Sequence, residues 1–220
     1  HDIEVLPNGN ILMIAWERFY ESDWSAYGRV NISNPLNQMW GTAILEIQPN
    51  LQDGTSEIVW EWHLFDHLVQ DIGPEYLATY GEISDYPELM NINEGEAGGS
   101  GGPGGANADW MHINAIDYNP ILDQIVISSR FQDEIYIIDH STTTDEAASH
   151  SGGNSGMGGD FLYRWGNPEK YDRGNSSDKK LDDQHSVNWI ESGYPGEGNI
   201  ILFNNKHDGN TSAALEFKPP

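Results

Sequence analysis

The chain has 220 residues, which is enough for one substantial hydrophobic core. It is a strongly acidic protein, because 35 Asp and Glu oppose ten Lys and Arg and the formal net charge is −25. A surface of this charge repels nucleic acid and anionic lipid, and we expect neither as a partner. No apolar run approaches the ~20 residues of a spanning helix, so we expect no membrane insertion. The absence of cysteine excludes disulfides.

Three segments of the chain begin with a histidine and follow the same plan. His1, His112 and His185 each open an apolar run that passes through a turn into a second apolar run. The turns contain Gly, Pro and Asn, as hairpin turns do. In the middle segment, Arg130 follows the second run, and Asn114 shares a strand face with His112 by alternation. We interpret each segment as a β-hairpin with a histidine at the same structural position.

Further apolar runs follow the hairpins and complete repeats of up to four short strands. These runs lie at residues 43–47, 57–62, 135–138, 161–165 and 214–217. Such repeats are typical of the blades of a β-propeller. The sequence therefore predicts an all-β fold, a β-propeller of which this chain represents about three to four blades. Because the innermost strand of every blade lines the propeller axis, we expect the three histidines to meet there.

Three to four blades are too few to close a ring, so we expect the chain to be a portion of a longer polypeptide. Open sheet edges would then allow pairing with another chain, including a homo-oligomer. Two glycine-rich insertions, near residues 94–108 and 141–159, are interpreted as flexible surface loops. The predicted organisation is one partial propeller domain over residues 1–220.

Residues 61–69 change to three- and four-residue apolar spacing, which predicts a short helix. Residues 28–31 are interpreted as a short extra strand. A helix would place His63 and His67 four residues apart, as in some zinc sites. Leu64 replaces the glutamate of that pattern and no third ligand is evident, so a short helix over the blade edge is favoured and no metal is expected.

Several candidate residues also have a plainer interpretation. A histidine at the start of a strand is more often a hydrogen-bonding turn residue than a catalyst, but three at one repeat position with Arg130 in register favour function. Trp110 could stack on an aryl group, although core packing explains it as well. Asp178, Asp182 and Asp183 could bind calcium, but their spacing lacks the Gly and Glu of an EF-hand, and solvated surface is favoured.

Four ordered motifs carry a resemblance to a known family. They read DWMHIN, ISSRFQDEIYIID, RWGNP, and QHSVNWI followed by FNN. Together they resemble the bacterial arylsulfate sulfotransferases (arylsulfotransferases) that work without phosphoadenosine phosphosulfate. The opening HDIEVLPNGNIL is similar to an earlier blade start of that family. The resemblance implies a six-bladed propeller with an axial funnel, a secreted or periplasmic location, and no cofactor.

The resemblance also implies roles for the site residues. His185 matches the histidine that attacks the sulfur of an aryl sulfate and is transiently sulfated before a phenol accepts the group. His112 and Arg130 match the positions that hold the sulfuryl oxygens, with Asn114 beside them, and His1 matches an axial histidine that assists proton transfer. The residue types suit this chemistry, because a neutral imidazole is a nucleophile and a guanidinium fork binds an oxyanion.

One function of a different class also fits the sequence. It is a non-catalytic extracellular binding or structural propeller, stabilised by calcium, whose axial histidines only hold an anion or pack the channel.

Overall fold

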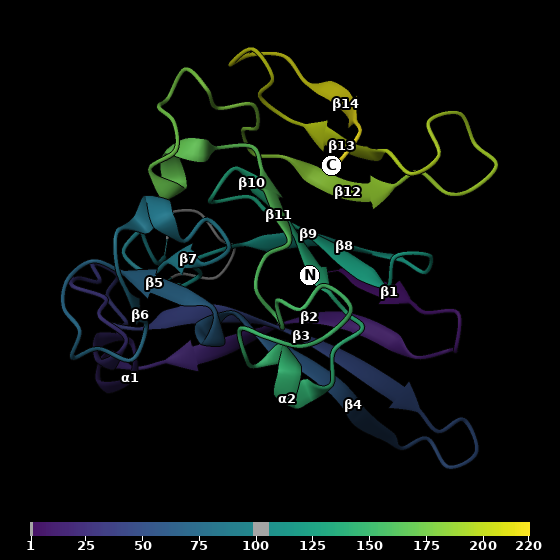
Figure 1. Cartoon of the computed structure of the whole chain (residues 1–220), viewed down its shortest axis with the longest axis horizontal. Helices are drawn as coiled ribbons and strands as arrows, with labels where there is room; N and C mark the ends of the chain where they lie inside the picture. Colours follow the sequence, from purple (N-terminus) through teal and green to yellow (C-terminus); the bar gives the residue numbers. More distant parts are fainter. Residues whose placement is uncertain (1, 99–105) are drawn as a thin grey trace.

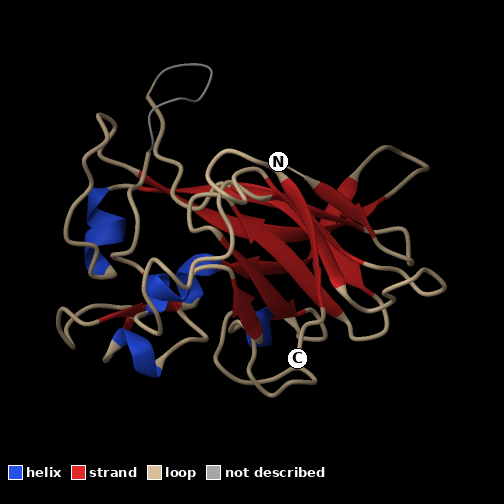
Figure 2. Cartoon of the chain, turned by 90° about the horizontal axis from the view of Figure 1, so that it is seen from above, coloured by secondary structure: helices blue, strands red, loops and turns tan. Residues whose placement is uncertain are grey.

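The computed structural model describes residues 2–98 and 106–220. His1, with its predicted role, and residues 99–105 of the first glycine-rich insertion lie outside the described residues. Within the described residues the strands form four separate sheets, none of which closes on itself (Figure 1). The fold is mostly β, as predicted, with short helices in the connections (Figure 2).

Three of the sheets in the described part are antiparallel meanders, in which each strand pairs with the next along the chain. The first consists of β1 (Ile3–Val5), β2 (Ile11–Phe19), β3 (Met39–Pro49) and β4 (Ser56–His63). The second consists of β8 (Ile113–Asn119), β9 (Gln124–Ser129), β10 (Glu134–Asp139) and β11 (Tyr163–Trp165). The third consists of β12 (His185–Trp189), β13 (Ile200–Asn204) and β14 (Ala213–Phe217). The strands of the predicted repeats are confirmed, and their assembly into a propeller stays a prediction.

The fourth sheet is parallel and lies in the connection between the first two meanders. It consists of β5 (Leu68–Gln70), β6 (Thr79–Tyr80) and β7 (Met90–Asn91). The helix predicted over residues 61–69 is wrong, because β4 runs to His63 and only one 3-10 turn, η1 (Leu64–Asp66), precedes β5. All three residues of β5 are buried, and a strand covered on both faces resembles a buried helix in composition.

The remaining helices are short. They are α1 (Glu21–Ala26), η2 (Ile83–Asp85), α2 (Thr144–Ala147) and η3 (Pro168–Tyr171). The second insertion, residues 141–159, consists of turns and the short α2, which has a capping box between Thr143 and Glu146, and its flexibility stays a prediction. The strand predicted at 28–31 is absent, and the guanidinium of Arg29 in that stretch donates to four main-chain carbonyl oxygens. No helix of the described residues is long and apolar enough to cross a membrane.

The second meander is packed on both faces. Ile125 and Ile127 of β9 face the core that it shares with the first meander, and Val126 faces the core that it shares with the third. Because both faces are covered, the centre of β9 is three consecutive β-branched residues rather than an apolar and polar alternation.

The first strands of the three meanders lie side by side. Strand β8 packs next to both β1 and β12. Side chains connect them, since Asp2 accepts a hydrogen bond from the main-chain N–H of Ile116 (3.2 Å) and Asp117 accepts one from that of Trp189 (2.6 Å). The residues just before β8 and at the start of β12 are therefore brought to one end of the sheets.

A buried ion pair stabilises the outer side of the second meander. Nε of Arg164 donates to Oε1 of Glu134 (3.1 Å), and a second hydrogen bond joins Nη2 to Oε2. The two side chains are 4% and 0% exposed. The guanidinium also donates to the carbonyl oxygen of Leu89 (3.1 Å) and lies 4.0 Å from the ring centroid of Tyr171. Both charges are thus satisfied away from water.

Glu134→Ala removes the carboxylate and leaves the guanidinium of Arg164 buried without its ionic partner. We expect the free energy of unfolding to fall by about 3–5 kcal/mol, the usual cost of breaking a buried ion pair. Urea unfolding followed by tryptophan fluorescence measures this change. Glu57→Ala at an exposed position of β4 is the control and should stay within about 0.5 kcal/mol of the parent. A loss no larger than that of the control would contradict the prediction.

Candidate active site

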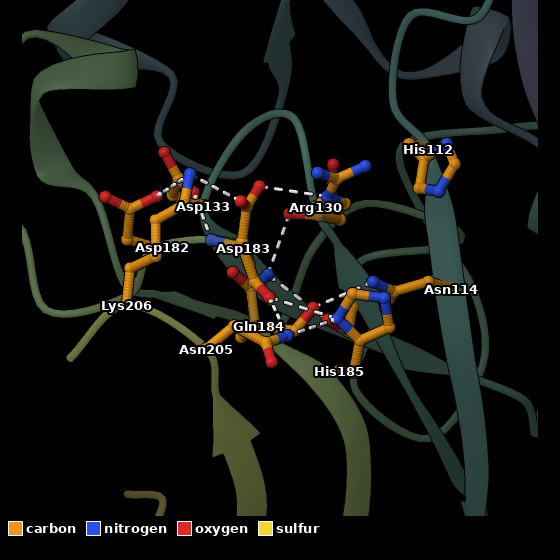
Figure 3. A network of polar contacts seen from close by, with 12 residues as sticks. His112, Asn114, Arg130, Asp133, Asp182, Asp183, Gln184, His185, Asn205 and Lys206 are labelled. Atoms are coloured by element: carbon orange, nitrogen blue, oxygen red, sulfur yellow. Dashed lines mark hydrogen bonds and ion pairs between the residues drawn. The ribbon is translucent and has the colours of Figure 1, made fainter. Parts of the chain in front are cut away.

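A group of polar side chains gathers where β8 and β12 begin and β9 ends (Figure 3). It contains His112, Asn114, Arg130 and His185. The main-chain N–H of Arg130 donates to the carbonyl oxygen of His112 (3.1 Å). The amide of Asn114 donates to the carbonyl oxygen of Gln184 (2.7 Å), the residue before His185. The structure brings His112, Asn114, Arg130 and the residue before His185 together at one end of the sheets, and their roles stay predictions.

His185 is half-buried, and its imidazole ring is held through Nδ1. Nδ1 lies 3.0 Å from the main-chain carbonyl oxygen of Asp183. It also lies 2.9 Å from Nδ2 of Asn205, which donates to the same carbonyl oxygen at 2.6 Å. The carbonyl oxygen, which only accepts, favours a ring proton on Nδ1, whereas the amide of Asn205, which only donates, favours a lone pair there. We infer the tautomer with the proton on Nδ1, because the Asn205 amide already donates to the same carbonyl oxygen. In that tautomer Nε2 carries the lone pair.

Asp183 connects the cations of this group. Its Oδ1 accepts from Nε of Arg130 (2.9 Å), and its Oδ2 lies 2.6 Å from Nζ of Lys206. Burial alone would raise the pKa of Asp183, but the hydrogen bonds and charges of Lys206 and Arg130 outweigh it and lower that pKa. Among the described residues, the two Nη groups of Arg130 have no hydrogen-bond partner. The guanidinium thus keeps donors for an anion.

His112 is held by a carboxylate rather than by a carbonyl. Oδ2 of Asp109 lies 2.6 Å from Nδ1 of His112, and Oδ1 accepts from the main-chain N–H of the same histidine (2.9 Å). Asp109 is buried, with 5% of its surface exposed. The imidazole also packs on Phe131, with 4.8 Å between ring centroids. The two histidines therefore differ in the chemistry of their Nδ1 partner.

The backbone next to both histidines is strained. His112, Asp183 and Ser186 adopt left-handed φ angles of 48°, 54° and 55°. The pairing of β12 with β13 is irregular between His185 and Asn188. Residues with a Cβ atom rarely adopt such φ angles, at a cost of ~1–3 kcal/mol each, and do so where the surrounding structure imposes them. Strain of this kind is concentrated at functional sites.

Buried amides complete the group. Nε2 of Gln184 donates to the carbonyl oxygens of Ser129 (2.8 Å) and Glu134 (3.0 Å), which fixes the segment that leads into β12. In the part of the chain that the structure describes, Oδ1 of Asn114 is buried and has no hydrogen-bond partner. An unsatisfied buried acceptor is uncommon and often marks a functional site.

The aromatic residues considered from the sequence lie in the core. Trp110 is fully buried, donates from its indole to the carbonyl oxygen of Glu94 (2.8 Å) and packs edge-on against Phe65. Core packing, which the sequence left open, describes this position, and the ring has no exposed face on which an aryl group could stack. Trp189 is likewise buried, in the core between the second and third meanders.

Four residues of the group received no role in this site from the sequence: Asp109, Asp183, Asn205 and Lys206. Two of them, Asp109 and Asn205, lie inside the DWMHIN and FNN motifs. Asp183 lies in an acidic run that is typical of solvated surface, but Arg130 and Lys206 reach it from other segments. Asp109 stands three residues before His112, a spacing that allows a local side-chain hydrogen bond, and this signal could have found it. No local signal marks Lys206.

A second histidine cluster lies beside β5. The Nδ1 atoms of His67 and His150 lie 2.7 Å and 2.8 Å from the same carboxylate oxygen of Asp160. Nε2 of His67 faces the carbonyl oxygen of Ala147 at 2.8 Å. These three side chains are the candidates for a metal site among the described residues.

The separations within this cluster are those of hydrogen bonds. Two ligands of a tetrahedral zinc ion stand about 3.3 Å apart, given metal–ligand distances of about 2.0–2.1 Å. We therefore interpret the cluster as a set of hydrogen bonds that attaches the second insertion to the buried His67. The zinc pair considered from the sequence is not formed either, because Nδ1 of His63 faces Glu17 (2.9 Å).

A nucleophilic imidazole beside a guanidinium with unused donors is the arrangement of a group-transfer enzyme for an anionic substrate. A family model described as Arylsulfotransferase (ASST) matches residues 1–218. The match covers nearly the whole chain, so this chain belongs to the arylsulfotransferase family, a family of sulfotransferases whose substrates are aryl sulfates and phenols. The resemblance drawn from the four motifs is confirmed. No curated protein matches the chain at a significant level.

An acidic cleft lies at the opposite ends of the same strands. It has a volume of about 460 Å³ and is lined by β1, the β8–β9 turn and the end of β12. Burial raises the pKa of Glu4 to about 7, and the negative charges of Asp117, Asp2 and Glu191 act in the same direction. Burial also raises the pKa of Asp117. The carboxylates at this end of the strands repel an anion, whereas the other end offers the unused Nη donors of Arg130.

Glu4→Gln tests the acidic cleft through the pH dependence of stability. The pKa of Glu4 rises from its ordinary value of 4.5 to about 7 in the folded state, so folded protein binds this proton more tightly than unfolded protein. The stability of the parent therefore falls as the pH rises from 4.5 to 7. We expect the melting temperature of Glu4→Gln to be higher than that of the parent at pH 8 and equal to it at pH 4.

Melting curves between pH 4 and pH 8 measure this difference, and Glu57→Gln on the exposed part of β4 is the control. If the difference in melting temperature between Glu4→Gln and the parent does not change with pH, Glu4 is not protonated preferentially in the folded state.

Proposed function

We propose that this chain transfers a sulfuryl group from an aryl sulfate to a phenol through a covalent intermediate on Nε2 of His185. The observation that supports this most is the hydrogen bond from Nδ1 of His185 to the carbonyl oxygen of Asp183, because it leaves the lone pair on Nε2. A neutral imidazole with a fixed tautomer is ready to attack sulfur without first losing a proton.

Arg130 binds the sulfuryl oxygens in this proposal. Its Nε is fixed on Asp183, so the planar fork is oriented before substrate arrives, and the Nη groups supply the donors. Asn114 lies beside it, held on the chain segment that leads to His185. Arg130, Lys179 and Lys206 gather in this region of a chain with a net charge of −25, and each of them pairs with a carboxylate. The unused Nη donors of Arg130 are the groups available to an anionic donor.

The proposal extends to the architecture and the location. Three meanders whose first strands lie side by side support the arrangement of propeller blades around an axis, with six blades by the family resemblance. The protein acts after export, as a secreted or periplasmic enzyme, and its open sheet edges permit a homo-oligomer. Membership of an enzyme family does not favour the non-catalytic binding propeller.

His185→Ala removes the nucleophile, and we expect it to abolish both transfer and the covalent intermediate. Arg130→Ala should lower transfer by at least ~10²-fold, as for the loss of a charged oxyanion donor. Release of nitrophenolate from 4-nitrophenyl sulfate measures turnover. Intact mass after an alkaline quench, which preserves an acid-labile N–S bond, detects the added sulfuryl group.

His207→Ala is the matched control, because His207 is an exposed histidine after β13 and bonds to Thr211 through its main chain. It should keep the parent's activity. Near-full activity of His185→Ala, or a sulfuryl group mapped to another residue, would overturn the assignment of His185.

A further inference from the structure

We propose that Asp109 and His112 are the proton carrier of the reaction. His112 gives its proton to the departing phenolate and takes one from the acceptor phenol, and Asp109 positions and polarises it. This inference rests on the proposed sulfuryl transfer through His185. It departs from the role that the resemblance implies for His112, which is to hold the sulfuryl oxygens.

The carboxylate of Asp109 is fixed by its surroundings. The carbonyl oxygen of Asp109 accepts a hydrogen bond from the main-chain N–H of Gly98 (2.8 Å). Asp109 also forms an isolated parallel β-bridge with Trp40, whose main-chain N–H donates to the carbonyl oxygen of Ala108 (2.7 Å). With its main chain bound on two sides and 5% of its surface exposed, the residue cannot turn its carboxylate to water. Both carboxylate oxygens are directed to His112.

The partners at Nδ1 divide the two histidines chemically. A carbonyl oxygen, as at His185, orients the ring and carries no net charge. A carboxylate, as at His112, orients the ring and brings a full negative charge to its Nδ1 side. Different Nδ1 partners at two neighbouring imidazoles are a basis for separate catalytic roles.

The placement of the two rings suits an in-line displacement. Figure 3 shows His112 and His185 at different ends of the group, with Asn114 on β8 and Arg130 after β9 between them. A sulfuryl group held by Arg130 and attacked by His185 expels its phenolate on the side away from His185. A proton donor is needed on that side, and His112 is the second imidazole of the group, which Figure 3 shows apart from His185.

In the first half of the reaction, Nε2 of His185 forms a bond to sulfur while the bond from sulfur to the aryl oxygen breaks. The electron pair of the broken bond stays on the aryl oxygen, which takes the Nε2 proton of the His112 imidazolium. Phenol leaves, and His112 is neutral. In the second half, His112 takes the proton of the acceptor phenol, whose oxygen bonds to sulfur as the N–S bond breaks and its electron pair returns to His185.

The test compares two donors in Asp109→Asn. 4-Nitrophenyl sulfate has a leaving group that departs without a proton, whereas phenyl sulfate needs an acid. Single-turnover sulfation of His185 without acceptor, followed by intact mass, isolates the first step. We expect Asp109→Asn to lower the rate of His185 sulfation by ~10²-fold or more with phenyl sulfate, and by less than about tenfold with 4-nitrophenyl sulfate. A residue with only a structural role would slow both donors alike.

His112→Gln provides a second route to the same result if Asp109→Asn folds poorly, and it should show the same selective loss. Combining the two substitutions should add little, since both remove one proton carrier. Asp160→Asn is the matched control, because Asp160 is also a buried carboxylate on Nδ1 of a histidine but lies beside β5. Asp160→Asn should leave unchanged the ratio of the sulfation rates measured with the two donors.

Equal slowing of both donors in Asp109→Asn and His112→Gln would overturn this inference and leave the proposed function intact. A parent protein that forms no sulfated His185 with either donor would overturn both.

Discussion

The second meander, β8–β11, is covered on both faces, and the position of everything at the candidate site depends on that double burial. With Ile127 turned to one core and Val126 to the other, the sheet cannot slide against either neighbour without exposing apolar surface. Strand β8 is thereby held between β1 and β12. Residues that are more than seventy positions apart in the sequence are brought together by packing, and no direct bond between the histidines is required.

Charge is distributed unevenly along these same strands. The few cations of a very acidic chain are used where their positions matter: Arg164 satisfies a buried carboxylate, and Arg130 and Lys206 share Asp183. Asp183 prevents the two cations from repelling each other while it leaves part of the guanidinium unused. At the opposite end, burial and the neighbouring carboxylates raise the pKa of Glu4. The strands therefore connect an end where cations and carboxylates are paired to an end that carries carboxylates.

Strand positions and the approach of His112 to Arg130 could be predicted because apolar runs, turn residues and repeat spacing are local signals. The roles of Asp109 and Asp183 could not, because a carboxylate in an acidic sequence looks like solvated surface until cations and histidines from distant segments reach it. The helix expected at 61–69 failed for a related reason. A short apolar run buried on both faces carries no period, and the parallel partners of β5 lie far along the chain.

The left-handed backbone at His112, Asp183 and Ser186 has a consequence for protein engineering. Glycine would remove the local strain at each position, but it would also give the unfolded chain more conformational freedom, so the net gain in stability would be small. At His112 and Asp183 glycine would also delete the imidazole and the carboxylate of the candidate site, and at Ser186 it would loosen the main chain next to His185. A search for stabilising substitutions that ranks sites by backbone strain alone would select these three positions and weaken the geometry that the rest of the fold maintains.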